Sequence, residues 1–129
     1  ILFDEYTTHG VAFGKVTSTA SSTFGVYSEN VEVSSLNGYY TSVAIKPENT
    51  DAYGTYTLSV KYYDDANVLI LQKTQTMRNI HMERWGYMSV YARKSEIAGA
   101  YTAVVRVDCT PDAPASGIVF YIDRVVFRQ

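Results

Sequence analysis

Three aromatic side chains, Trp85, Tyr87 and Tyr91, occupy odd positions within the segment HMERWGYMSVYARK, residues 81–94. Residues two apart in a β-strand point to the same face of a sheet, so the three rings share a face if this segment is a strand. The even positions hold apolar residues that need no hydrogen-bond partner in a core, whereas a buried tyrosine or tryptophan does need one. We therefore expect the rings to face solvent. The alternative is that Trp85 is buried at a sheet edge and the tyrosines only cover the surface.

A row of flat rings on one surface suits a carbohydrate, because a pyranose presents an apolar C–H face that stacks on an aromatic ring. If each ring excludes about 50 Å² of apolar surface, it contributes about 1 kcal/mol of binding free energy. Three such platforms, set against the cost of association, predict a dissociation constant on the order of high micromolar to millimolar. Several copies in a parent protein would then supply the useful avidity.

Polar partners for such a ligand are expected on neighbouring strands. The candidates are the residues on the presumed solvent faces of three segments. They are Ser59, Lys61 and Tyr63 in residues 56–63, Tyr40, Ser42 and Lys46 in residues 39–46, and Thr102, Arg106 and Asp108 in residues 100–109. Arg106 is the first polar candidate, because a guanidinium stacks on a ring and also donates in a fork. The alternative for Arg106 is a solvated strand charge. Tyr121 belongs either to the core or to the ligand face.

The sequence contains no pattern typical of catalysis. The two histidines, His9 and His81, are far apart, and neither belongs to an HExxH motif. Asp64 and Asp65 are adjacent and are explained by a turn, because aspartate side chains bond locally to the backbone. Active sites also assemble across distant parts of a sequence, but we expect a protein that is not an enzyme.

Composition and charge restrict the class of protein. A chain of 129 residues is the length of one domain, and no linker divides residues 1–129. The formal net charge is −2 and the basic residues are scattered, which argues against a nucleic-acid partner. No apolar run approaches the ~18 residues of a membrane span.

The single cysteine, Cys109, is expected to be buried and inert. Because the chain begins at Ile1, we expect that it was excised from a larger protein.

The pattern of apolar residues predicts an all-β fold. In the segment YGTYTLSVKYYDD, apolar and polar positions alternate with the period of a strand that has one face in the core. The following segment NVLILQ, residues 67–72, is continuously apolar, so we expect it to return as a strand buried on both sides. Strands are expected near residues 11–16, 24–33, 39–46, 56–63, 67–72, 82–92, 100–109 and 117–128. About eight strands without helices predict an antiparallel jelly-roll β-sandwich.

Three of these segments resemble a known family. NGYYTSVAIKP (37–47), MERWGYMSVYA (82–92) and GIVFYIDRVVF (117–127) are similar, in this order, to strands of carbohydrate-binding modules of the family 4, 9 and 22 type. These modules belong to the galactose-binding-like jelly-roll sandwiches. The resemblance covers about two-thirds of the chain, from Asn37 to the end. Each motif alone is common, whereas their order and spacing are more specific.

The resemblance also implies one structural calcium ion. The family often opens with a proline–glycine–phenylalanine–glutamate-like stretch whose glutamate helps to bind calcium, and the aspartate of its terminal strand is a second ligand. Here LFDEY offers Asp4 and Glu5 but lacks the proline and glycine, and Asp123 matches the terminal aspartate. Calcium needs several oxygen ligands, which Asp123 with Asp4 or Glu5 and backbone carbonyls would supply. The alternative is that Asp123 hydrogen-bonds a neighbouring loop.

These observations predict a lectin-like, non-catalytic domain that recognises a polysaccharide of a plant or microbial cell wall. The predicted partners are that polysaccharide or oligosaccharide and other domains of the parent chain, with no nucleic acid and no membrane. The parent would be extracellular, on a cell surface or part of a virion. One alternative is a structural, assembly or host-recognition domain of a phage tail or adhesion protein. Another is a small hydrolase or isomerase on the same fold, which would need a convergent carboxylate pair.

Overall fold

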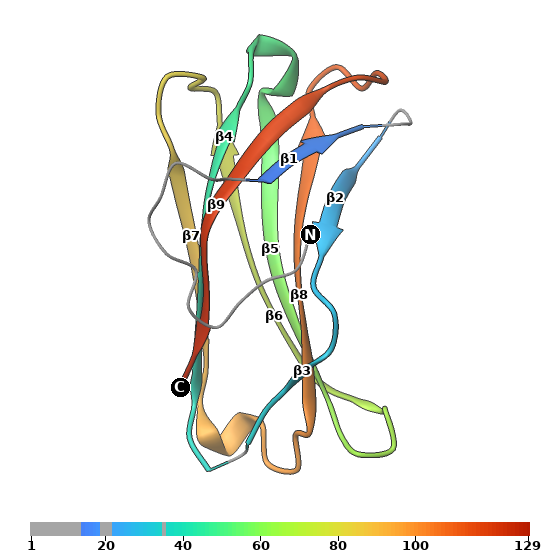
Figure 1. Ribbon diagram of the computed structural model, residues 1–129, viewed down its shortest axis with the longest axis vertical. Helices are drawn as coiled ribbons and strands as arrows, with labels where there is room; N and C mark the ends of the chain where they lie inside the picture. The colour runs from blue at the N-terminus through green and yellow to red at the C-terminus, as the bar shows by residue number, and fades with distance from the viewer. Residues whose placement is uncertain (1–13, 19–21, 35) are drawn as a thin grey trace.

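Two antiparallel β-sheets pack face to face in the computed structural model, which describes residues 14–18, 22–34 and 36–129 (Figure 1). The four-stranded sheet has the order β1 (Gly14–Thr17), β9 (Val119–Arg128), β4 (Tyr39–Pro47) and β7 (Gly86–Ala92). The five-stranded sheet has the order β2 (Phe24–Tyr27), β8 (Thr102–Pro111), β5 (Gly54–Tyr63) and β6 (Leu69–Asn79), and β3 (Val31–Glu32) also pairs with β8. The predicted all-β jelly-roll sandwich is confirmed, with nine strands in the described part of the chain.

Helical structure in the described residues is limited to two 3₁₀ turns, η1 (Thr50–Ala52) and η2 (Lys94–Glu96). Asn49 precedes η1, and its side-chain oxygen accepts a hydrogen bond from the backbone N–H of Asp51 at 3.0 Å. Within this part of the chain, no helix is long and apolar enough to cross a membrane.

Successive side chains of the central strand β5 point alternately into the core and onto the outer face of the five-stranded sheet. Its inward side chains are the fully buried Tyr56, Leu58, Val60 and Tyr62, as their period of two predicted. The intervening side chains point away from the core, where they meet outward residues of β8 and β6. One strand therefore fixes the packed interior and one outer surface of the sandwich together.

Aromatic rings from both sheets meet in the core. The Phe120 ring packs edge-on against Tyr56, with 5.3 Å between the ring centroids, and lies 5.4 Å from Phe24. The Tyr56 hydroxyl donates a hydrogen bond to the carbonyl oxygen of Ala52 at 2.8 Å, and burial raises the pKa of this phenol. Cys109 is buried beside it, as expected, and burial raises the pKa of its thiol to about 11, so the thiol is protonated at neutral pH.

The prediction for residues 67–72 is wrong in two respects. The strand β6 begins at Leu69 and continues to Asn79, and it forms an edge of the five-stranded sheet. An edge strand pairs with a neighbouring strand on one side only. The apolar residues of β6 are therefore not enclosed, and the Leu69 side chain is 47% exposed. The predicted strand 24–33 is likewise interrupted, because β2 and β3 pair with separate parts of β8.

Side chains join the two sheets along the β6–β7 border. The Gln75 side-chain oxygen on β6 accepts a hydrogen bond from the backbone N–H of Ser89 on β7 at 2.6 Å. In the 3₁₀ turn η2, which follows β7, the Glu96 carboxylate lies 2.6 Å from the ammonium group of Lys73 on β6. Inward-pointing charge of this kind protects a strand edge from pairing with another chain.

Replacing Glu96 with glutamine is expected to lower the melting temperature at neutral pH. The hydrogen bond from Lys73, followed by the one from the Arg93 backbone N–H, lowers the pKa of Glu96 from 4.5 to about 2 in the folded protein. A carboxylate with a lowered folded-state pKa stabilises the fold above its unfolded-state pKa and loses that contribution as the pH falls. The difference in melting temperature between wild type and Glu96→Gln should therefore shrink as the pH falls from about 4.5 to about 2, followed by circular dichroism.

The matched control is Glu83→Gln, because Glu83 is exposed and belongs to none of the ion pairs found in the described part of the chain. Its substitution should change the melting temperature little at any pH. A Glu96→Gln effect that stays constant across this pH range would contradict the assigned role of the carboxylate.

Candidate functional site

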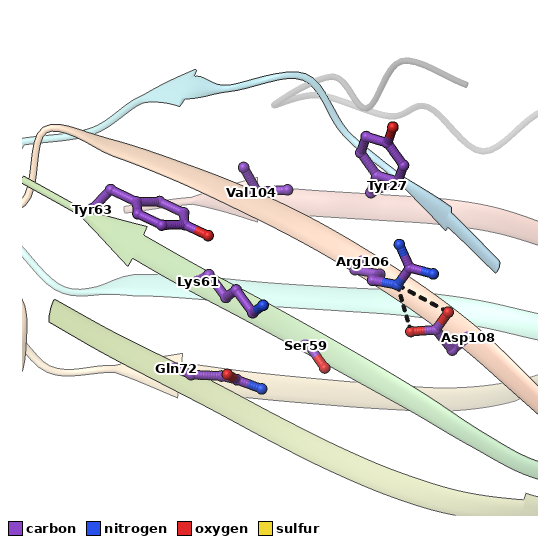
Figure 2. Close-up of a pocket in the computed structure, with 8 residues that line it drawn as sticks. All are labelled: Tyr27, Ser59, Lys61, Tyr63, Gln72, Val104, Arg106 and Asp108. Carbon is purple, nitrogen blue, oxygen red and sulfur yellow. Dashed lines mark hydrogen bonds and ion pairs between the residues drawn. The ribbon is translucent and has the colours of Figure 1, made fainter. Parts of the chain in front are cut away.

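A depression of about 380 Å³ lies on the outer face of the five-stranded sheet (Figure 2). Four strands, β2, β8, β5 and β6, contribute to its lining, so a continuous hydrogen-bonded sheet supports it. The lining combines two phenol rings with charged and hydroxyl-bearing or amide-bearing side chains. These residues are Tyr27, Ser59, Lys61, Tyr63, Gln72, Val104, Arg106 and Asp108.

Strand register explains how these residues converge. Arg106 on β8 lies opposite Tyr27 on one side and opposite Ser59 of β5 on the other. In the next outward row, Lys61 of β5 lies between Val104 and Gln72. Ser59 is only 8% exposed although it points outward, because longer neighbouring side chains surround it. A small residue between long ones creates the floor of the depression.

The depression contains one internal ion pair. Arg106 Nε donates to both carboxylate oxygens of Asp108, at 2.9 and 2.8 Å, and these hydrogen bonds raise the pKa of the guanidinium (Figure 2). The guanidinium carbon of Arg106 lies 5.6 Å from the centroid of the Tyr27 ring. Among the lining residues, Figure 2 marks no other interaction, and Lys61 belongs to none of the ion pairs found in the described part of the chain.

The predicted aromatic face lies on the other sheet. Tyr87 and Tyr91 are 58% and 54% exposed, whereas Met88 between them is 1% exposed, so the expected outward orientation of these two rings is confirmed. Trp85 precedes β7 and is half-buried. Tyr40 of β4 lies opposite Tyr91 on the same outer face.

Cations accompany the rings of this face. The Arg124 guanidinium lies 5.9 Å from the Tyr87 ring centroid and donates a hydrogen bond to the Tyr87 hydroxyl at 2.8 Å. The Lys46 ammonium lies 5.3 Å from the Trp85 ring and 6.0 Å from the Tyr121 ring. Arg128 occupies the corresponding position over Tyr40, at 5.8 Å. Part of each of these ring surfaces is therefore already in contact with a cationic side chain.

The residues predicted as one carbohydrate site divide between two opposite faces of the sandwich. Tyr63 and Arg106 line the depression on the five-stranded sheet. The other five lie on or beside the four-stranded sheet; they are Trp85, Tyr87, Tyr91, Tyr40 and Tyr121. The structure does not bring the two groups together, because β5 and β8 belong to the five-stranded sheet whereas β4, β7 and β9 belong to the four-stranded sheet.

Sequence reasoning missed three lining residues of the depression, namely Tyr27, Gln72 and Val104. Tyr27 has a local signal, since it follows the alternation of the segment FGVY. Its position beside Arg106 depends on the pairing of β2 with β8, which are separated by most of the chain. No local pattern specifies that pairing.

The calcium prediction falls partly outside the described residues, because Asp4 and Glu5 lie there. Asp123 Oδ1 accepts a hydrogen bond from the backbone N–H of Arg124 at 2.8 Å. Among the residues that the structure describes, no group of three or more histidine, cysteine, aspartate or glutamate side chains is placed to hold a metal ion. The calcium ion stays a prediction.

Comparison with known proteins gives similarity in structure but not in sequence. No family model matches the chain, and no curated protein matches it in sequence. A solved family 16 carbohydrate-binding module has a TM-score of 0.61 and 15% identity, covering 94% of this chain and 79% of the module. A family 61 module in complex with β-1,4-galactotriose has a TM-score of 0.59 and 16% identity, with coverages of 94% and 73%. A structure of infectious bursal disease virus has a TM-score of 0.56 and 9% identity, covering 88% of this chain and 32% of the viral chain.

At these identities the similarity shows the fold alone, and the same fold is found in structures as different as a carbohydrate-binding module and a virus. The resemblance found in the three strand motifs is confirmed at that level: this chain has the jelly-roll sandwich of carbohydrate-binding modules.

Proposed function

We propose that this chain is a non-catalytic carbohydrate-binding domain and that the depression on the five-stranded sheet binds a segment of a polysaccharide. The observation that carries the proposal is the combination of phenol rings with polar side chains in one concave surface. Its volume of about 380 Å³ falls within the ~300–1,000 Å³ typical of ligand pockets. The fold shared with carbohydrate-binding modules supports the same conclusion.

The side chains of the depression suit a neutral, hydroxyl-rich ligand. The Tyr63 ring offers an apolar surface for a pyranose C–H face, and the Lys61 ammonium and Gln72 amide are positioned to hydrogen-bond sugar hydroxyls. Ser59 leaves room above the sheet for the sugar ring. Because strands hold all of these residues, little backbone entropy is lost on binding, but ordering the Lys61 and Gln72 side chains costs free energy, and we expect weak affinity for a single site.

The aromatic face of the four-stranded sheet is the second candidate location for the same function. The exposure of Tyr87 and Tyr91 favours it. The cations beside Tyr87 and Tyr40 disfavour it for a neutral sugar, because stacking would have to displace a guanidinium group from the ring. In the depression Arg106 lies over Tyr27 in the same way, but among the described residues no cation is found over the Tyr63 ring. We therefore assign neutral polysaccharide to the depression.

Replacing Tyr63 with alanine is expected to weaken binding of neutral β-1,4-galactan by about fivefold, since about 1 kcal/mol of ring burial is lost. The variants Trp85→Ala and Tyr91→Ala should bind like wild type, because these residues lie on the opposite sheet. Retardation in polysaccharide-containing gels measures all three variants, and a glycan array selects a better neutral ligand if galactan is not bound.

The opposite pattern, with Trp85→Ala and Tyr91→Ala impaired and Tyr63→Ala unaffected, would move the site to the aromatic face. A wild-type protein that binds no polysaccharide, neutral or acidic, would refute the proposed function. Thermal unfolding of each variant shows whether a loss of binding is due to a loss of folded protein.

We further propose that the domain works within a secreted, cell-surface or virion-associated protein, beside other domains of its parent chain. The rival function is an assembly domain, in which Tyr87 and Tyr91 would contact another subunit; the shared fold of the viral structure is what favours it. Light scattering separates the two, because a stable dimer or trimer through this face would favour assembly.

A further inference from the structure

Positive charge is concentrated on the outer face of the four-stranded sheet. Lys46, Arg124 and Arg128 lie over the rings of this face, and Lys15 of β1 pairs with Tyr121 beside them. None of the four cations belongs to the ion pairs found among the described residues. This charge contrasts with the formal net charge of −2 for the whole chain.

Two carboxylates, those of Glu48 and Asp123, lie next to these four cations, and each accepts a hydrogen bond from a neutral group while it keeps its negative charge. Glu48 accepts a hydrogen bond from the Tyr121 hydroxyl at 2.8 Å. Asp123 accepts one from the backbone N–H of Arg124, also at 2.8 Å. The guanidinium groups of Arg124 and Arg128 instead contact phenol rings, which leaves N–H donors for an external anion.

A β-bulge directs Arg124 to the centre of this face. The register between β4 and β9 shifts between Ser42 and Ala44, and Arg124 has a φ angle of 52°, an unfavourable value for a residue with a side chain. Around the bulge, Asp123 is half-buried, Arg124 is exposed and Val125 is buried. Bulges re-aim side chains, and strained backbone of this kind is concentrated at functional sites.

The cations follow the direction of the strands. Arg128 of β9 pairs with Tyr40 at one end of β4, and Lys46 near the other end of β4 pairs with Tyr121 of β9. Between them, Arg124 comes directly after Asp123, which pairs with Ala44. At about 3.4 Å per residue, the separations from Tyr40 to Ala44 and from Ala44 to Lys46 along β4 are about 14 Å and about 7 Å. A linear polymer lying along the strands would meet all three cations in turn.

We propose that this face is a second binding site, which takes an acidic polysaccharide carrying carboxylate groups. Guanidinium forks match carboxylate geometry, and the exposed side chains of Tyr87 and Tyr91 supply apolar contact for the sugar rings between the acidic groups. A neutral polysaccharide would offer hydroxyl acceptors to these cations but no opposite charge. The inference extends the proposed function to a different ligand class, and its site is separate from the depression.

The test compares polygalacturonate with its methyl ester, two polymers that share a backbone and differ in carboxylate charge. Wild type should bind the acid form more tightly by about fivefold or more at low salt, and added salt should reduce the preference. The variant Arg124→Gly should lose most of it and stay folded, because glycine adopts a φ angle of 52° without strain. Arg128→Gln should reduce the preference by a similar factor. Biolayer interferometry with immobilised polymer measures each affinity.

The control is Arg78→Gln, which removes an exposed arginine from the five-stranded sheet, where it pairs with Asp112. It should bind both polymers like wild type. Equal binding of the acid and the ester by wild type, or an unchanged preference in Arg124→Gly, would overturn the inference. Equally tight binding to single-stranded DNA would overturn it as well, because the face would then attract any polyanion.

Failure of this inference is distinguishable from failure of the proposed function. If galactan binding depends on Tyr63 while the acid and ester bind equally, only the second site is wrong. If the acid preference depends on Arg124 while no neutral polysaccharide binds, the second site stands and the assignment of the depression is wrong.

Discussion

Replacing Ser59 with tryptophan is expected to abolish measurable binding of neutral polysaccharide to the depression. Ser59 forms the floor of the depression and is only 8% exposed there, so an indole at this position would occupy the space of the sugar ring. Since wild-type affinity is expected to be weak, a further loss of about 1.4 kcal/mol, or tenfold, takes binding below detection. Isothermal titration calorimetry with the best ligand from a glycan array measures the change.

The fold should tolerate the Ser59→Trp substitution, because the side chain points away from the core and tryptophan is favourable in strands. Thr55→Trp is the matched control: it lies on the same face of β5, but outside the lining of the depression. Thr55→Trp should bind like wild type. Retained binding in a folded Ser59→Trp protein would show that the depression is not the site.

Replacing Phe120 with alanine is expected to lower the free energy of unfolding by about 3–5 kcal/mol. Phe120 is 0% exposed, and its ring contacts Tyr56 and Phe24 from the opposite sheet, so truncation leaves a cavity between the two sheets. A loss of this size is a large share of the ~5–15 kcal/mol that stabilises a typical domain. Denaturation with urea, followed by fluorescence, measures the difference.

Tyr101→Ala is the control for the core substitution, because Tyr101 is 55% exposed. It should change the free energy of unfolding by less than about 0.5 kcal/mol. If Phe120→Ala cost no more than Tyr101→Ala, the packing described for the centre of the core would be incorrect.

Local alternation is sufficient to predict most of the fold. The period of two in β5 correctly separates Tyr56 and Tyr62, which are buried, from Lys61, which is not. The same argument correctly orients Tyr87 and Met88 in β7. It fails for β6, where an apolar run is half-exposed because the strand lies at an edge, and sheet position is a property of the whole topology.

The candidate site is less predictable, because periodicity specifies which residues point outward but not which sheet carries them. Arg106 and Tyr91 both face solvent, and only strand pairing shows that they do so on opposite sides of the sandwich. Tyr27 joins Arg106 through a contact between strands that are far apart in sequence. The left-handed backbone of Arg124 was not predicted either, because bulges depend on the register of two paired strands.

The link from Gln75 to the Ser89 backbone has a consequence for how copies of the domain behave when they are crowded together. An exposed border strand with free amides is a template on which a second copy can add its own strand, and growth by that route leads to fibrils. In this protein β7 is an edge strand of its sheet, and the backbone N–H of Ser89 on β7 already donates a hydrogen bond to the Gln75 side chain of the same molecule. An array that displays many such domains close together on one filament or surface would thereby be protected at this point against self-association.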